Sequence, residues 1–128
     1  MKNLVILCFL LLCCCSEDDD DSLAIVTACE VDNPLEQLTW LSEQIRTKVL
    51  NQTEFSEYDF ITQGKFNSET VFLFKNCNPI ANSVVPVLDC QGIMLGLLSL
   101  EIPQEEIFEE TLIWKNAPSS CDLTVFGD

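Results

Sequence analysis

The sequence predicts a small α+β domain in which one N-terminal helix packs on a four- to five-stranded antiparallel meander sheet, with two disulfides. Three observations lead to this prediction: a helical periodicity over residues 33–50, a series of strand patterns over residues 58–115, and four cysteines spread over residues 29–121. A helix followed by sequential strands is typical of the α+β class. We expect a single domain at residues 29–128 and find no internal repeat.

Residues 1–14 have the composition of a secretory signal peptide. Lys2 leads into an apolar run that is too short to span a bilayer, which distinguishes a signal peptide from a transmembrane helix. We therefore expect residues 1–14 to be removed on export, and residues 15–28 to form a lipid anchor and an acidic tether.

The end of the apolar run resembles a bacterial lipobox, in which an aliphatic residue lies three positions before an acylated cysteine. Cys15 fits this pattern and is the candidate for palmitate attachment, while Cys14 fits almost as well and remains the alternative. Stable anchoring needs more than one acyl chain, and the acylated cysteine of this class carries two or three. We expect such a lipid to hold the protein on the outer membrane.

An acidic tract follows the candidate anchor directly and consists of Ser16, Glu17, Asp18, Asp19, Asp20 and Asp21. Serine and clustered acids after a lipidated cysteine resemble the surface-export signal of Bacteroidota lipoproteins, so we expect the domain to face the cell exterior. The alternative is a solvated spacer that encodes no address. The sequence Asp21-Ser22-Leu23 resembles the O-glycosylation pattern of Bacteroidota exported proteins, which makes Ser22 a candidate glycan site.

A helix start is predicted at Asn33-Pro34-Leu35-Glu36. Asn33 suits the N-cap, Pro34 suits the first helical position, and Glu36 can bond back to the cap as in a capping box. An apolar stripe at three- and four-residue spacing then predicts a helix to about Leu50. The stripe consists of Leu35, Leu38, Leu41, Ile45 and Val49.

Trp40 does not belong to this stripe. In a continuous helix it lies about 200° from Leu38, on the polar face. A large aromatic side chain there is a candidate binding residue. The alternative, which we expect, is that Leu23–Val26 or the C-terminal tail covers Trp40 within the domain.

Five strand patterns follow the helix. Residues 58–66 alternate in polarity, which predicts a half-buried strand, whereas residues 70–74 are apolar on both faces and predict a central strand. Pro86 places the start of the strand at residues 84–90 at an edge or bulge. The remaining strands are predicted at residues 93–100 and 111–115, and the turns and loops at Asn67–Ser68, Asn76–Ser83, Gln91–Gly92 and Pro103–Glu106.

Four cysteines follow the candidate anchor: Cys29, Cys77, Cys90 and Cys121. An even number in a small exported domain indicates two disulfides, with three possible connectivities. We favour Cys77–Cys90, which joins neighbouring strands, and Cys29–Cys121, which joins the ends of the domain. A four-cysteine zinc site is the alternative, although the closely spaced cysteine pairs of such sites are missing.

The charge and composition exclude several functions. The chain has 21 acidic and 6 basic residues, a net charge of −15 and no histidine. Such a charge repels nucleic acids and anionic headgroups, and the lack of histidine removes the usual general base and the Ser-His and Cys-His pairs. We interpret Glu105-Glu106 and Glu109-Glu110 as solvated surface rather than glycosidase carboxylates. Asp18 to Asp21 lack the glycine-spaced pattern of a calcium loop. We expect no enzymatic activity, no cofactor and no metal site.

Three segments resemble a group of small Bacteroidota lipoproteins of uncharacterised function: Asn33 to Leu41, Val87 to Gly92 and Thr111 to Lys115. The resemblance implies localisation and fold, and it identifies no catalytic residues. We therefore expect a surface-tethered, non-enzymatic binding or accessory module. The alternatives are an inhibitor of a hydrolase, for which Val84-Val85-Pro86 or the turn near Ile93 would be the inhibitory loop, and an accessory subunit of an outer-membrane complex.

Overall fold

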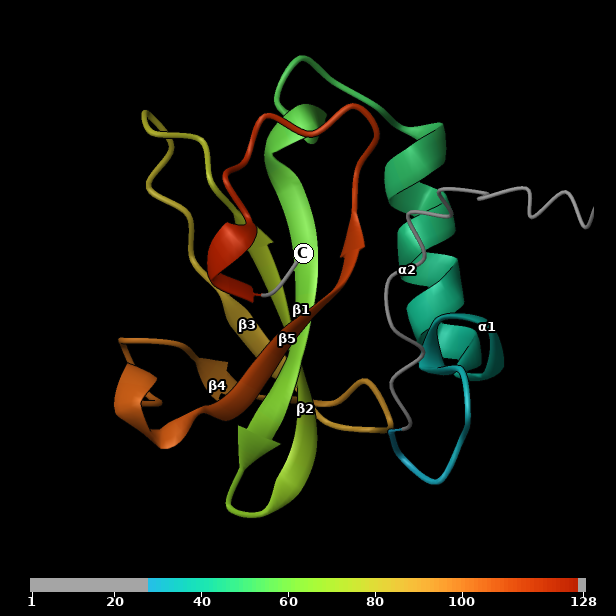
Figure 1. The fold of residues 1–128 in the computed structure, drawn as a ribbon, viewed down its shortest axis with the longest axis vertical. Helices are drawn as coiled ribbons and strands as arrows, with labels where there is room; N and C mark the ends of the chain where they lie inside the picture. Colours follow the sequence, from blue (N-terminus) through green and yellow to red (C-terminus); the bar gives the residue numbers. More distant parts are fainter. Residues whose placement is uncertain (1–27, 127–128) are drawn as a thin grey trace, which may run out of the picture.

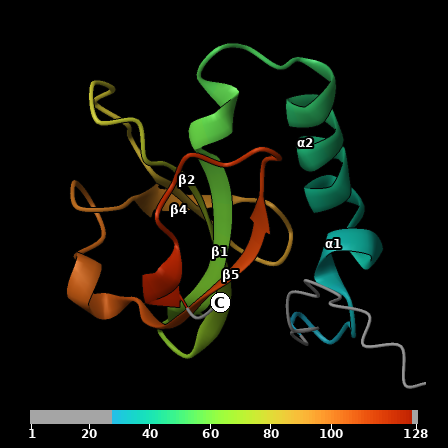
Figure 2. The same cartoon turned by 45° about the horizontal axis from the view of Figure 1, so that its top comes forward.

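The structure is a computed structural model, and it describes residues 28–126. Two helices precede a five-stranded antiparallel sheet and lie beside it: α1 (Pro34–Gln37) and α2 (Thr39–Leu50) (Figures 1 and 2). Two disulfides cross-link the domain. The predicted α+β class is confirmed.

The sheet has the strand order β4-β3-β2-β1-β5. Strands β1 to β4 form an antiparallel meander, and β5 returns across the sheet to pair with β1. The central position of β2 agrees with its prediction as a strand that is apolar on both faces. The bounds are β1 (Asp59–Phe66), β2 (Glu69–Asn76), β3 (Pro86–Leu88), β4 (Met94–Leu97) and β5 (Phe108–Lys115), with short 3-10 turns η1 (Ser56–Tyr58), η2 (Gln104–Glu106) and η3 (Thr124–Phe126).

The predicted single helix is interrupted at Leu38. Its backbone angles, φ −86° and ψ 100°, are extended, so α1 ends after one turn and α2 begins in a new orientation. Asn33 occupies the N-cap position and Pro34 the first turn, but the Asn33 side chain makes no capping bond. The Oε1 atom of Gln37, and not the predicted Glu36, accepts the bond from the Asn33 N–H at 3.0 Å.

The helices cover one face of the sheet and form one part of the core there. Leu41 is fully buried against Ile61, Phe72 and Ile113. The predicted apolar stripe stops before the end of α2, because Val49 is 48% exposed.

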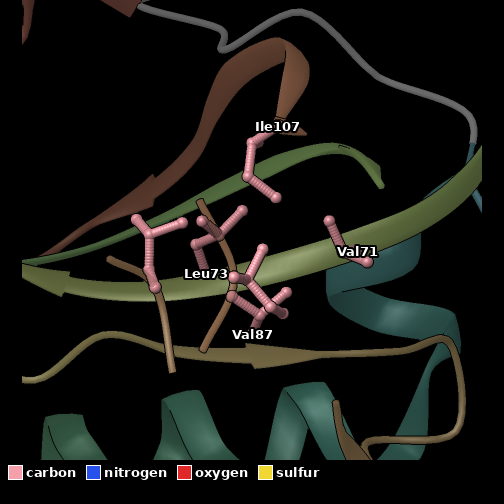
Figure 3. Close-up of a cluster of buried hydrophobic side chains, with 6 residues drawn as sticks. Val71, Leu73, Val87 and Ile107 are labelled. Atoms are coloured by element: carbon pink, nitrogen blue, oxygen red, sulfur yellow. The ribbon is translucent and has the colours of Figure 1, made fainter. Parts of the chain in front are cut away.

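The opposite face of the sheet carries a second cluster of buried side chains. Val71, Leu73, Val87 and Ile107 pack together there (Figure 3). The C-terminal tail extends this layer, since Leu123 is buried against strand β1 and strand β5. Because β1 lies between two strands and both of its faces are covered, its residues from 60 to 64 are buried. The prediction of a half-buried strand at residues 58–66 was therefore wrong.

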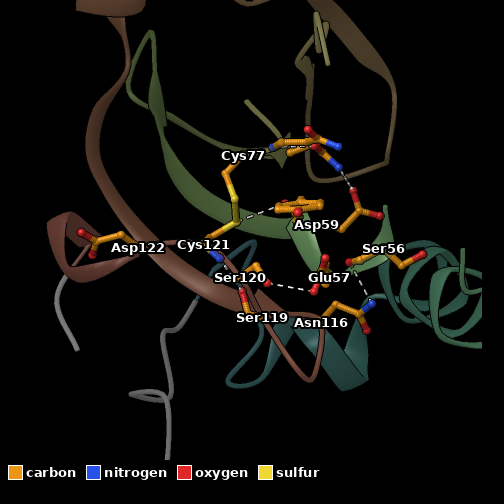
Figure 4. The surroundings of a disulfide bond; sticks show 12 residues. Ser56, Glu57, Asp59, Cys77, Asn116, Ser119, Ser120, Cys121 and Asp122 are labelled. Carbon is orange, nitrogen blue, oxygen red and sulfur yellow. Dashed lines mark hydrogen bonds between the residues drawn. A yellow bond between two sulfur atoms is a disulfide. The ribbon is translucent and has the colours of Figure 1, made fainter. Parts of the chain in front are cut away.

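The favoured cysteine pairing was wrong as well. The disulfides are Cys29–Cys90 and Cys77–Cys121, with Cα–Cα distances of 5.6 and 5.8 Å. Cys77 directly follows β2 and forms its disulfide with Cys121 of the C-terminal tail. The side chains around this disulfide form several hydrogen bonds (Figure 4). The zinc alternative is excluded for the same reason, because all four sulfurs are used in disulfides.

Candidate functional site

The predicted anchor and tether lie outside the described residues. These are Cys14, Cys15, Ser16, Glu17, Asp18, Asp19, Asp20, Asp21 and Ser22, together with Leu23–Val26 as a possible cover for Trp40. The candidate site therefore consists of residues of the folded domain alone.

Trp40 faces the sheet rather than solvent. Its ring meets Phe72 edge-on with the centroids 5.5 Å apart, and its Nε1–H donates to the carbonyl oxygen of Cys90 at 2.9 Å. The break at Leu38 changes the helix register and turns Trp40 inward. Trp40 is thus half-buried within the fold, and the C-terminal tail, which packs on Phe60 on the opposite face, does not cover it.

Beyond Trp40, the face of the sheet that carries α2 continues into an open groove of about 620 Å³. Phe72 pairs with Leu88 and Leu88 pairs with Met94, so these side chains share one face of the sheet. Since side chains alternate along a strand, Phe74 and Pro86 lie on this face too. The floor of the groove is therefore apolar, and it consists of Phe74, Pro86, Leu88 and Met94.

The walls of the groove come from segments that are distant in the sequence. Gln44 and Lys48 of α2 form one side, Phe55 closes one end, and Val84 belongs to the connection between β2 and β3. Several of the apolar residues are substantially exposed: Phe55 by 48%, Val84 by 55% and Met94 by 59%. The apolar surface continues past the groove along the edge strand, where Ile93 and Leu95 are also exposed.

One end of the groove is polar. Lys48 Nζ donates to Asp59 Oδ2 at 2.9 Å, and Asn76 Nδ2 donates to Asp59 Oδ1 at 2.8 Å. Each oxygen of Asp59 accepts one of these bonds and keeps a further acceptor site, and the ammonium group of Lys48 has three N–H bonds and keeps donors for a ligand. The groove thus offers apolar contact area and a few hydrogen-bond donors, which are the features of a binding site.

The structure brings together two segments that the sequence indicated separately as inhibitory loops. Val84 and Pro86 line the groove, and Ile93 directly precedes Met94 on its floor. The contributions of Phe55 and Lys48 were not predicted, since nothing in their local sequence places them beside β3. The signals that the sequence offered for this site were Val84-Val85-Pro86 and the apolar run Ile93-Met94-Leu95, which follows a turn.

Glu110 differs from its expected role as a solvated carboxylate. It forms an ion pair with Lys75 on the face opposite the groove, and the two side chains are only 14% and 13% exposed. Thr62 Oγ1 also donates to Glu110, and the Lys75 ammonium lies 5.2 Å from the centre of the Phe126 ring. The contacts of Glu110 give it a structural role under the C-terminal tail.

The disulfide Cys77–Cys121 has polar neighbours of its own (Figure 4). Ser120 Oγ donates to Glu57 Oε2 at 2.8 Å, and the Asn116 side-chain amide donates to the Ser56 carbonyl at 2.9 Å. The neighbouring Glu57 carboxylate raises the pKa of Tyr58 through a hydrogen bond and through its charge. These contacts attach the tail to the turn before β1.

Comparisons with known proteins give no match: no protein-family model fits the chain, and no curated protein or solved structure is significantly similar to it. Within residues 28–126, no helix has the length and apolar character required to cross a membrane. The same residues contain no group of three or more side chains arranged to hold a metal ion.

Proposed function

We propose that this protein is a surface-tethered lipoprotein that acts as a non-enzymatic binding module, and that its partner binds in the groove between α2 and β4. Acylated Cys15 would hold it on the outer membrane, and the acidic tract Ser16–Asp21 would direct it outward. Both proposals rest on the sequence pattern of residues 1–22 and on its resemblance to Bacteroidota lipoproteins.

The groove is the observation that carries this proposal. A small monomeric domain rarely exposes a contiguous apolar patch without a partner, because apolar surface is more stable out of water. Here a floor of four apolar side chains is open, and Met94 at its outer limit is 59% exposed. A single exposed apolar residue would need no explanation, but a walled groove does.

Site-specific photocrosslinking on intact cells tests this function. A photoreactive phenylalanine analogue at Met94 should trap a defined partner, whereas the same analogue at Leu100, which is 72% exposed and outside the groove, should not. The variant Val84→Asp, placed in the Met94-crosslinker chain, should abolish the adduct. Equal adducts at both positions, or none at either, would contradict a groove-bound partner.

Inhibition of a hydrolase is a second candidate, because the connection between β2 and β3 projects from the domain. Ile80 in this loop is 85% exposed, and the Cys77–Cys121 disulfide fixes the chain three residues before it. The Asn78 side chain accepts a bond from the Ile80 N–H at 3.0 Å and orders the turn. Inhibition of any of a panel of secreted peptidases that Ile80→Asp abolishes would favour this alternative over the groove.

A further inference from the structure

The structure has a second feature that bears on the partner, namely an excess of unpaired negative charge. We infer that the groove binds a positively charged protein segment that carries large apolar side chains. This inference rests on the proposed function and specifies the chemistry of the partner. The groove explains why the partner should carry apolar side chains, and the negative charge of the domain explains why it should be positively charged.

The charge excess is large in the folded part. Residues 28–126 contain 15 acidic side chains and 5 basic ones. Three of the five bases are already used in ion pairs: Arg46 with Glu43, Lys48 with Asp59, and Lys75 with Glu110. Most acids in this part of the chain therefore have no ion-pair partner, and the domain presents a negative field to anything that approaches it.

A negative field repels an acidic partner and accelerates the approach of a basic one. It also opposes the docking of a second copy of this chain, which carries the same excess. The field itself does not select a position on the surface. The apolar groove does, since burial of apolar side chains on Phe74, Leu88 and Met94 supplies affinity there.

The volume of the groove fits a short segment rather than a whole protein face. At about 620 Å³ it lies within the range of 300–1,000 Å³ typical of ligand pockets. Two or three large side chains of a partner would occupy it. Basic residues beside them would remain in solvent, within the net negative field of the domain.

Met94 makes this inference testable at a single atom. The chain has two methionines, Met1 and Met94, and Met1 belongs to the predicted signal peptide. In the exported and processed protein, 13C-methyl-methionine labelling therefore gives one resonance, from the floor of the groove. Its assignment is checked with Met94→Leu, in which the resonance should disappear.

The probes are three synthetic ten-residue peptides that alternate lysine with leucine, glutamate with leucine, or lysine with serine. We expect only the lysine–leucine peptide to shift the Met94 methyl resonance. Raising the salt concentration from about 50 to 300 mM should weaken this binding about tenfold, because the screening length shortens. Val84→Asn, which removes apolar contact without changing the charge, should also weaken it about tenfold, while Leu100→Asn, at a position outside the groove, should leave it unchanged.

Five results would overturn the inference. The first is equal binding of the glutamate–leucine peptide, and the second is equal binding of the lysine–serine peptide. The third is concentration-dependent dimerisation that shifts Met94 without peptide, which assigns the groove to a second copy. The fourth is a shift of the Met94 methyl resonance when Ile25→Ser is introduced and no peptide is present. That result would show that the chain's own segment Leu23–Val26 occupies the groove. If no peptide binds while the Met94 crosslinker still traps a partner, the groove function stands and the charge inference fails.

Discussion

Trp40 shows how one backbone torsion decides the role of a side chain. In an uninterrupted helix it would lie opposite Leu38, but the extended backbone at Leu38 turns it onto Phe72 and the turn at Gly92. Gly92 has φ +78°, and a Cβ atom there would lie 2.7 Å from the Trp40 ring. The contact thus requires glycine at this position for two reasons, the torsion angle and the space.

We predict that Trp40→Ala lowers the free energy of unfolding by about 3 kcal/mol, as for removal of a large packed aromatic side chain. Trp40→Phe should cost about 1 kcal/mol, because it keeps an aromatic ring and loses the hydrogen bond to Cys90. Urea denaturation followed by circular dichroism measures both values. A change within about 0.5 kcal/mol for Trp40→Ala, the range of the exposed control Leu100→Ala, would contradict the packing described here.

Glu110 gives a matched test of burial, because its neighbour Glu109 is exposed. Glu110→Gln leaves the Lys75 ammonium without its counter-charge in a setting where only 13% of the side chain meets solvent. We expect a loss of about 3 kcal/mol, the usual effect of removing one partner of a buried ion pair. Glu109→Gln should change stability by less than about 0.5 kcal/mol. Equal effects of the two substitutions in thermal or urea unfolding would show that the ion pair is solvated.

At the scale of the elements, most strands could be predicted because their signals are local. The turn Asn67–Ser68 has positive φ at both residues, 49° and 67°, which is the geometry that a two-residue hairpin prefers. The break at Leu38 has no such signal, since leucine is a good helix former and no glycine or proline marks the interruption. Tertiary packing of Trp40 and Leu41 accounts for it.

The cysteine pairing could not be predicted, because it depends on where β5 and the tail return. The sequence places Cys77 and Cys90 on neighbouring segments, but β5 pairs with β1 and brings Cys121 next to Cys77. Cys90 lies at the turn after β3. The segment before α1 runs next to this turn, and its Cys29 forms the disulfide with Cys90. The spacing of the cysteines in the sequence does not tell where the C-terminal tail or the segment before α1 packs against the sheet.

Peptide mapping checks this connectivity. Trypsin alone leaves Cys77 and Cys90 in one fragment, residues 76–115, so a second cleavage before Asp89 is required. Under non-reducing conditions we expect residues 76–88 linked to residues 116–121, and residues 89–115 linked to the fragment that ends at residue 31. A product that joins residues 76–88 to residues 89–115 would contradict the fold.

The disulfides should contribute similar stability, because they close loops of similar length. The sequence separations are 61 and 44 residues, and the loss of loop-closure entropy corresponds to about 4 kcal/mol for each. Paired replacement of Cys29 and Cys90 by serine, and separately of Cys77 and Cys121, should therefore lower the free energy of unfolding to a comparable extent. A negligible effect of either pair would show that the bridge is not formed in solution.

At the scale of the whole molecule, the groove exists because the helices are short relative to the sheet. Helix α2 packs over β1 and β2, and the residues of β3 and β4 on the same face are only partly covered within residues 28–126, with Met94 59% exposed. The sequence predicted these strands and their apolar side chains, but not which face stays open. That depends on the placement of α2 after the break at Leu38.

The proposed display on the cell surface also concerns the whole molecule, and it would depend on two separate signals. We predict that Cys15→Ser releases the protein from the membrane fraction, because the proposed acyl chains are attached through the Cys15 thiol, which serine lacks. Fractionation and labelling with a palmitate analogue measure this directly. Labelling that persists in Cys15→Ser would move the anchor to Cys14.

Replacement of Glu17, Asp18, Asp19, Asp20 and Asp21 by alanine should act differently from Cys15→Ser. Lipidation should continue, because the cysteine is intact, while digestion by protease added to intact cells should stop. The fold should be unaffected, since these residues precede the described domain, and its urea unfolding should match that of the parent protein. Removing five negative charges from the chain should also weaken binding of the basic lysine–leucine peptide slightly, because they contribute to its net negative charge. Unchanged digestion on intact cells would show that the tract is a spacer and does not direct export to the surface.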